Sequence, residues 1–181
     1  MKDRTTAVVF DLDSTLRDSQ QRHHLSPART KAEGQGLPDG ALDNPKLLTM
    51  KDWTDYTKAG LNDAPIPGTV TLMRLLADHH QIHVVSGSTE DARHESRLWL
   101  ERFAPWWDYL ELRREDGVEA GVLAARYILK LQQHGIPVLV AFNDWRPAAE
   151  QITTLTGVPV VVVNPCYDGM CTCGYASEAI E

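Results

Sequence analysis

Two aspartates separated by a single residue, Asp11 and Asp13, follow a short apolar run at residues 6–10. In an extended strand, residues two apart point the same way, so both carboxylates can meet at the carboxyl end of this strand. Two anions held so close are costly unless a divalent cation neutralises them, and Mg²⁺ prefers oxygen ligands of this kind. The pair therefore indicates a magnesium site, with a turn and helix-capping aspartates as the alternative for these two residues alone.

Two other apolar runs also end in groups suited to phosphate or metal chemistry. Ser86 and Gly87 follow the run at residues 81–85 and offer a hydroxyl and a backbone N–H to a phosphate oxygen. The run at residues 136–142 is closely followed by Asp144, which supplies a third carboxylate. Acid, hydroxyl and acid at the ends of three strands point to one shared site.

The elements that must position these groups alternate along the chain. Near-continuous apolar runs rich in Val and Ile are typical of a parallel sheet covered on both faces. Strands alternating with helices predict an α/β fold, a three-layer open parallel sheet of the Rossmann-like kind, wound through right-handed crossovers. The predicted strands are residues 6–10, 81–85, 136–142 and 158–163, and the predicted helices are residues 68–80, 89–103, 118–133 and 147–156.

Three local signals refine the predicted helices. Ser88 and Asp91 resemble a capping box at the start of the helix at residues 89–103. Pro147 and Gly157 mark a helix start and stop. The buried face of the helix at residues 118–133 is predicted to carry Val118, Val122, Ala125 and Leu129.

One segment interrupts the alternation. Residues 17–67 contain no clear strand, and glycines and prolines break a polar stretch before a short helical pattern at residues 50–61. We expect a single domain over residues 1–181, in which residues 17–67 form a small cap insertion over the carboxyl edge of the sheet. Residues 164–181 form a cysteine-containing tail.

Composition limits the classes of function. The 181 residues suit one compact domain, and the net charge of −7 argues against extended nonspecific binding of nucleic acid. No apolar run of eighteen or more residues is present, and the N-terminus does not read as a signal peptide. We therefore expect a cytoplasmic protein without membrane association, and the oligomeric state stays open.

The motifs, taken in order, resemble those of the haloacid dehalogenase superfamily of phosphohydrolases. These are a strand with Asp-x-Asp-x-Thr, a strand with Ser, a basic residue, and a strand with an acidic residue. The resemblance covers about residues 6–165. Within it, WLERFAPWWDYLELRREDG and VAFNDWR are similar to stretches of the 3′-phosphatase domain of phage polynucleotide kinases and related small phage phosphatases. This similarity suggests a phage-encoded protein acting in a host cytoplasm.

The resemblance implies a mechanism with named roles. Asp11 would attack phosphorus and form an aspartyl-phosphate, and Asp13 would protonate the leaving alkoxide and then deprotonate the attacking water. Mg²⁺ would be held by a carboxylate oxygen of Asp11, by the main-chain carbonyl of Asp13 and, through water, by Asp144. The implied contacts to the phosphate or substrate come from Thr15, Ser86 and the Gly87 amide.

The same family pattern requires a basic residue against the phosphate. Arg126 is favoured by its spacing, and Lys130 lies four residues later on the same predicted helical face. Arg113 and Arg114 are rivals, because a planar guanidinium suits phosphate well. A solvated surface charge is the alternative for Arg126.

The chain departs from the phage pattern at three positions. Ser14 stands where a glycine is usual, Ser88 where an arginine is usual, and Asn143 where an aspartate is usual. None of these removes a core catalytic group. The missing arginine, however, would weaken the reaction or change the substrate.

The predicted cap carries candidate substrate contacts. Trp53, Tyr56, Arg22 and Arg29 are placed to contact a base or a second phosphate, although aromatic residues in a short helix also serve packing.

The tail carries a possible second metal site. Cys166, Cys171 and Cys173 could bind a structural Zn²⁺ with a fourth ligand from elsewhere, free thiols being the alternative.

The sequence thus predicts a Mg²⁺-dependent phosphomonoesterase. Its substrate would be a phosphorylated small molecule such as a nucleotide, or the terminal (3′) phosphate of a nucleic acid. Two alternatives stay open: a catalytically silent module that binds a phosphate ligand or a partner, and a phosphotransferase that uses the same residues.

Overall fold

The computed structural model describes residues 4–26 and 49–163. The predictions for Arg29 and for the three tail cysteines, including the zinc site, fall outside these residues.

Five parallel strands form one sheet in the order β3-β2-β1-β4-β5. The strands are β1 (Ala7–Phe10), β2 (Gln81–Thr89), β3 (Tyr109–Arg113), β4 (Val138–Asn143) and β5 (Val160–Val162). Four of them match the sequence prediction. The edge strand β3 was not predicted, because Tyr-Leu-Glu-Leu-Arg alternates exposed and buried side chains instead of forming an apolar run.

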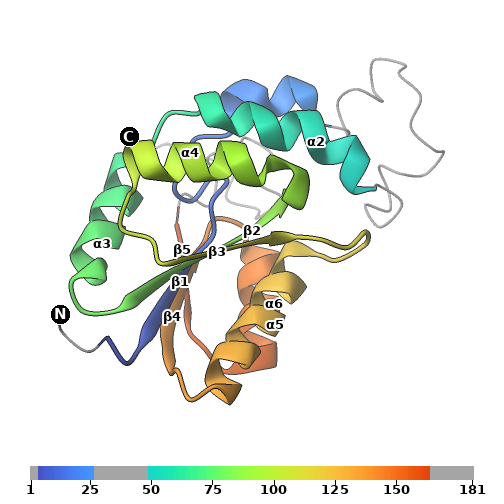
Figure 1. Cartoon of the computed structure of the whole chain (residues 1–181). Coiled ribbons are helices and arrows are strands. Elements are labelled where there is room, and N and C mark those ends of the chain that lie inside the picture. The colour runs from blue at the N-terminus through green and yellow to red at the C-terminus, as the bar shows by residue number, and fades with distance from the viewer. Residues whose placement is uncertain (1–3, 27–48, 164–181) are drawn as a thin grey trace, which may run out of the picture.

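Helices cover both faces of this sheet, as the sequence predicted. Figure 1 shows α3 and α4 on one side of the sheet, α5 and α6 on the other, and α2 above the ends of the strands. Within the described residues, no helix has the length and apolar character needed to cross a membrane. The α-helices are α2 (Met50–Ala59), α3 (Pro67–Ala77), α4 (Arg93–Phe103), α5 (Ala120–Gln133) and α6 (Arg146–Thr156), and the 3₁₀ helices are η1 (Gln20–Leu25), η3 (Gly60–Asn62) and η4 (Glu90–Ala92).

The core is divided in two by the sheet, because successive side chains of a strand point to opposite faces. Val8 and Phe10 of β1 belong to the cluster that includes Trp99 of α4, whereas Ala7 and Val9 belong to the cluster that includes Ile128 of α5. Every residue of β1 is buried. This central position makes the end of β1 a rigid place for a functional group.

Two local predictions are wrong. The helix predicted at residues 89–103 begins at Arg93, because β2 continues to Thr89, so Ser88 is a buried strand residue and not part of a cap. On α5 the prediction is right for Ala125, which is buried, but wrong for Leu129, which is exposed; the buried residues are Gly121, Ala124, Ala125, Ile128 and Leu131.

Small side chains explain the orientation of α5. A Cβ on Gly121 would lie 2.8 Å from Cα of Ala148 in α6, so this position admits only glycine in the present packing. The two helices approach closely along their small residues, and the larger aliphatic residues of α5 do not define its buried face.

The predicted stop of the last helix is confirmed. Pro147 lies in the first turn of α6, and Gly157 ends the helix with φ of 72° in the left-handed region. Nothing lies within 4 Å of a Cβ built on Gly157, so glycine is favoured there by backbone conformation alone.

We expect Gly157→Ala to lower the free energy of unfolding by about 1 kcal/mol, because an L-residue disfavours this conformation. Denaturant unfolding would measure the change. Gly68→Ala is a matched control, since a Cβ at Gly68 also meets nothing within 4 Å and its φ is ordinary. An equal loss of stability in both variants would contradict this explanation.

A buried histidine lies on the α5 side of the sheet. His83 of β2 stacks on Tyr109 with ring centroids 4.5 Å apart, and its Nδ1 lies 2.9 Å from the hydroxyl of Tyr127. Burial lowers the pKa of His83 to about 4, despite the opposing charge of Asp108. The imidazole is therefore neutral in the folded protein at neutral pH.

Because the folded-state pKa of His83 lies below its ordinary value of 6.5, its contribution to stability is present above pH 6.5 and is lost as the pH falls towards 4. We expect the free energy of unfolding to fall more steeply across this window in the wild type than in His83→Asn. Denaturant unfolding at several pH values would measure both slopes. Parallel slopes would show that His83 is not the titrating group.

Candidate active site

Asp11 and Asp144 lie beside each other at the carboxyl ends of the neighbouring strands β1 and β4. The backbone N–H of Asp11 donates to the carbonyl of Phe142 at 2.9 Å, so strand pairing extends to the aspartate itself. The hydroxyl of Thr15 lies 3.4 Å from Oδ2 of Asp11 and 3.3 Å from Oδ1 of Asp144. The structure thus brings two of the predicted metal-ligating carboxylates to one hydroxyl.

A tight turn after β1 presents Thr15 to both carboxylates. The backbone N–H groups of Leu16 and Arg17 donate to the carbonyl of Leu12 at 2.9 and 3.1 Å. Ser14 has φ of 58°, the left-handed region that glycine adopts most easily, and its hydroxyl lies 2.5 Å from that of Ser19. This conformation favours glycine at position 14, and the Ser19 contact supports the serine that occupies it.

The carboxyl group of Asp11 is held among other acids. Burial raises the pKa of Asp11 well above its ordinary value, and the nearby carboxylates of Asp144 and Asp13 raise it further. The backbone of Leu12 and the charge of Arg17 oppose this effect without cancelling it. An additional positive charge at this point would favour the ionised form of Asp11.

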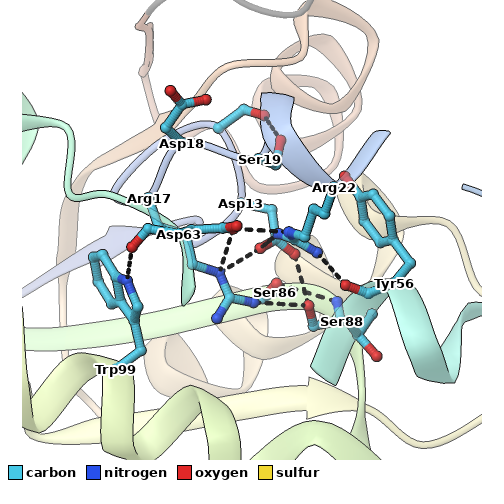
Figure 2. A network of polar contacts seen from close by, with 12 residues as sticks. Asp13, Arg17, Asp18, Ser19, Arg22, Tyr56, Asp63, Ser86, Ser88 and Trp99 are labelled. Atoms are coloured by element: carbon cyan, nitrogen blue, oxygen red, sulfur yellow. Dashed lines mark hydrogen bonds and ion pairs between the residues drawn. The ribbon is translucent and has the colours of Figure 1, made fainter. Parts of the chain in front are cut away.

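The carboxylate of Asp13, in contrast, is surrounded by donors. It accepts hydrogen bonds from Nε of Arg17 at 2.6 Å, from the hydroxyl of Ser88 at 2.6 Å and from Nη2 of Arg22, as Figure 2 shows. Burial raises the pKa of Asp13, but the two arginines and Ser88 outweigh burial and hold it well below its ordinary value. Asp13 is therefore ionised.

Asp63 joins the two arginines from the opposite side. It lies just after η3, accepts a hydrogen bond from Nε of Arg22 at 2.7 Å and is 3.7 Å from Nε of Arg17. Its backbone carbonyl also accepts from the indole N–H of Trp99 at 2.8 Å (Figure 2). The side chains of Asp63, Arg17 and Arg22 are each 3% exposed or less, so the two arginines and two aspartates form an almost buried ionic network.

The end of β2 reaches this network through a serine. The backbone N–H of Ser88 donates to the hydroxyl of Ser86 at 3.1 Å, and the Ser88 hydroxyl in turn donates to Asp13. Gly87 lies against the start of α5, where a Cβ would be 3.1 Å from that of Ala120. The predicted phosphate contacts Ser86 and Gly87 therefore lie at the same edge as the aspartates.

The basic residues that were predicted to contact the phosphate do not lie beside Asp13. Arg126 is exposed and pairs with Glu115 at 3.7 Å, and Lys130 is also exposed. The groups that hydrogen-bond to Asp13 in the described residues are Arg17, Arg22 and Ser88, and neither Arg126 nor Lys130 is among them. Arg126, Arg113 and Arg114 instead line a cavity of about 280 Å³ beside β3. The guanidinium groups that do reach the aspartates are those of Arg17 and Arg22, which the favoured assignment did not include.

The described cap residues that were predicted to contact a substrate instead contact one another in the structure. The guanidinium of Arg22 lies over the ring of Tyr56, 4.1 Å from its centroid, and Trp53 packs edge-on against Tyr56 at 5.6 Å. Arg22 is 3% exposed. In the state described here, these side chains pack against one another and support the ionic network.

The donor set partly fits a magnesium ion. No group of three or more His, Cys, Asp or Glu side chains capable of holding a metal is found in the described part of the chain. The side chains at the site are instead two carboxylates, Asp11 and Asp144, because the carboxylate of Asp13 faces the arginines. Oxygen ligands of this kind suit Mg²⁺, which retains several waters and needs only one or two carboxylates.

Sequence comparisons give no relative. No protein-family model matches the chain, and no curated protein matches it.

Solved structures, in contrast, share the fold. A haloacid dehalogenase-like hydrolase from Streptococcus pneumoniae matches 87% of this chain and 83% of its own at a TM-score of 0.59 and 14% identity. The HAD-hydrolase YfnB from Bacillus subtilis, solved bound to magnesium, matches 90% of each chain at a TM-score of 0.58 and 13% identity. This chain has a haloacid dehalogenase-like fold. At these identities, the comparison establishes the fold and not the substrate.

A larger protein matches the fold of this chain over part of its own length. A chain of the Pnkp1/Rnl/Hen1 RNA repair complex matches at a TM-score of 0.63 and 14% identity, over 90% of this chain and 43% of that chain. The present chain thus spans less than half the length of that chain.

The groups that hold Asp13 were not predicted in this role: Arg22 was predicted to contact a substrate, and Arg17 and Asp63 were not singled out. Arg17 follows Asp13 by four residues, a spacing that could have suggested a local ion pair. Asp63 carries no such signal, because fifty residues of mostly polar sequence separate it from Asp13. Asp63 reaches the arginines because the segment after α2 lies beside the turn that follows β1. The backbone N–H of Ile66 donates to the carbonyl of Leu16 at 2.8 Å.

We expect Asp63→Ala to lower the free energy of unfolding by about 3–5 kcal/mol, because it removes one partner of a buried ionic network and leaves two arginines with reduced compensation. Denaturant unfolding would measure the loss. Glu101→Ala is the control: it breaks the exposed pair with Arg97 and should cost less than about 0.5 kcal/mol. Similar losses in the two variants would contradict the buried network.

Proposed function

We propose that the protein is a Mg²⁺-dependent phosphomonoesterase that acts through an aspartyl-phosphate. The observation that carries the proposal is the pairing of Asp11 with Asp144 across the hydroxyl of Thr15, at the carboxyl ends of two central strands. Asp13 lies two residues from Asp11, and Ser86 and Gly87 lie at the same edge. The haloacid dehalogenase-like fold supports this assignment.

The metal would be held by Asp11, by the main-chain carbonyl of Asp13 and, through water, by Asp144. When bound, Mg²⁺ would supply the positive charge that lets adjacent carboxylates ionise and that lowers the repulsion between a phosphate and an attacking carboxylate. Burial and the acidic neighbours raise the pKa of Asp11, and a positive charge bound here would favour its ionised form.

In the first step, a carboxylate oxygen of Asp11 forms a bond to phosphorus while the bond to the leaving alkoxide breaks, and Asp13 gives that alkoxide a proton. In the second step, Asp13 takes a proton from water, whose oxygen displaces Asp11 from phosphorus and releases phosphate. Thr15, Ser86 and the Gly87 amide would contact the phosphate.

The first step requires a protonated Asp13, whereas Arg17 and Arg22 favour its ionised form. At least one guanidinium must therefore exchange its partner during turnover. A phosphate dianion competes well for a guanidinium, and Arg22, which joins Asp13 to the cap helix α2, is the better placed of the two to make this exchange.

The proposed substrate is a nucleotide or the terminal phosphate of a nucleic acid. The net charge of −7 favours a small nucleotide, whereas the likeness to a chain of an RNA repair complex favours a polynucleotide end. The proposed cap, residues 17–67, includes η1 and α2 and would limit what enters the site. We propose no extended contact with nucleic acid and no contact with a membrane.

We expect phosphate release from at least one member of a panel of 5′- and 3′-nucleotides and 5′- and 3′-phosphorylated oligonucleotides, with Mg²⁺ but not with EDTA. Asp11→Asn should reduce the rate by at least about 1,000-fold, because it removes the nucleophile. Phosphate would be measured colorimetrically.

Asp78→Asn is the matched control, since Asp78 is exposed at the end of α3 and should retain wild-type turnover. An alcohol added to the assay distinguishes transfer from hydrolysis, because a phosphotransferase would yield a new phosphate ester. Phosphate binding without metal-dependent turnover anywhere in the panel would replace the enzyme by the silent binding module.

A further inference from the structure

The guanidinium of Arg17 is the most enclosed charged group in the described residues. Arg17 is 0% exposed, and its group contacts Asp13 at 2.6 Å, Asp63 at 3.7 Å and the hydroxyl of Ser88 at 3.5 Å. Figure 2 shows these three partners around it, from the turn after β1, the segment after η3 and strand β2. Arg17 therefore joins three separate parts of the chain at Asp13.

Gly60 provides the space for this guanidinium. A Cβ on Gly60 would lie 2.4 Å from Cζ of Arg17 and 2.6 and 2.7 Å from its two terminal nitrogens. The backbone of Gly60 has φ of −58° and ψ of −14°, which any residue adopts. Glycine is thus needed here for room and not for backbone conformation.

This arrangement includes two features that lower stability. Nη1 of Arg17 is buried and has no hydrogen-bond partner among the described residues. Glycine in a helical conformation costs conformational entropy that alanine would avoid. Costs of this kind are expected where function, and not stability, dictates the residue.

Full enclosure distinguishes Arg17 from a residue that binds substrate. With no exposed surface, its guanidinium reaches no molecule outside the protein in this state. Its hydrogen bond to Oδ1 of Asp13 uses Nε, on one edge of the planar group, while a terminal nitrogen faces Ser88, itself bonded to Oδ2. The contacts fix both oxygens of the Asp13 carboxylate.

We infer that Arg17, seated against Gly60, is a positioning residue that fixes the direction of the Asp13 carboxylate for its proton transfers, an inference that rests on the proposed phosphomonoesterase function. Gly60 and Asp63 belong to the proposed cap insertion, so the same contact ties that segment to the catalytic turn. The guanidinium acts through Asp13 and not on the phosphate.

The test is a double-mutant cycle between positions 17 and 60, measured as kcat and KM in the phosphate-release assay with Mg²⁺ and as melting temperature. Arg17→Met keeps the length of the buried stem but removes the guanidinium. We expect it to lower kcat on the order of 10- to 100-fold with little change in KM, because binding is retained while the acid–base group is misplaced. Arg17→Lys should recover part of the loss, because it restores the charge without the planar fork.

Gly60→Ala should lower kcat in the same way, because the new methyl group displaces the guanidinium. In the Arg17→Met background it should leave kcat unchanged and raise the melting temperature, because the obstructing group is gone and alanine is the better helical residue. Gly68→Ala is the matched control: a Cβ there meets nothing, and kcat and KM should stay at wild-type values.

Three results would overturn the inference. Gly60→Ala could lower kcat equally in both backgrounds, which would show that it does not act through Arg17. Arg17→Met could raise KM at unchanged kcat, which would make Arg17 a substrate-binding residue, or it could lower the melting temperature alone, which would make its role purely structural. Absence of turnover in the wild type refutes the proposed function and this inference together, whereas any of the three results with an active wild type refutes the inference alone.

Discussion

Parallel pairing of β1 with β4 places two carboxylates at one edge of the sheet, and the rest of the site is arranged around their repulsion. Asp11 and Asp144 meet at Thr15, where burial and then the like charge of Asp144 raise the pKa of Asp11. Asp13 lies only two residues away, but two arginines enclose it, and their positive charges favour its ionised form. The turn therefore separates neighbouring acids into one with a raised pKa, Asp11, and one with a lowered pKa, Asp13.

Neutralising Asp13 requires contributions from distant parts of the chain. Arg17 and Arg22 follow within nine residues of it, but buried guanidinium groups need further acceptors. Asp63 supplies one from the segment after η3, and the backbone carbonyl of Tyr56 in α2 accepts from Arg22 at 2.8 Å. The segment predicted as a cap is thus bound to the turn after β1 by charge as well as by packing.

The sequence predicted the central architecture because the central strands carry the strongest signals. The runs in β1, β2 and β4 are nearly continuous and apolar, as strands buried on both faces must be, and the chemistry-bearing residues follow directly from their ends. The edge strand β3 was not predicted, because it buries only one face. Its buried and more exposed side chains alternate over only five residues, so no apolar run appears in the sequence.

Side-chain assignments depended on contacts that a sequence pattern does not contain. Periodicity placed Leu129 on the buried face of α5, but Gly121 and Ala124 decide how that helix packs on α6, and the larger residues are displaced towards solvent. Arg126, on the same helix, is exposed as well. The spacing of Asp11 and Asp13 correctly indicated that two acids share an edge, but it could not reveal that the Asp13 carboxylate turns to arginines whose further partner lies fifty residues away.

The strand order has a consequence for how such a protein can diverge. Thr15, Arg17 and Ser88, which contact aspartates of the site, follow or belong to β1 and β2, and Asp144 follows β4. These are the three inner strands, whereas β3 and β5 form the borders of the sheet. Additions at the borders, or changes on the outer surfaces of the helices, leave the spacing between the inner strands intact. The arrangement of the site residues can therefore be kept while the sequence of the periphery changes, and the same three inner strands can be built into much longer chains.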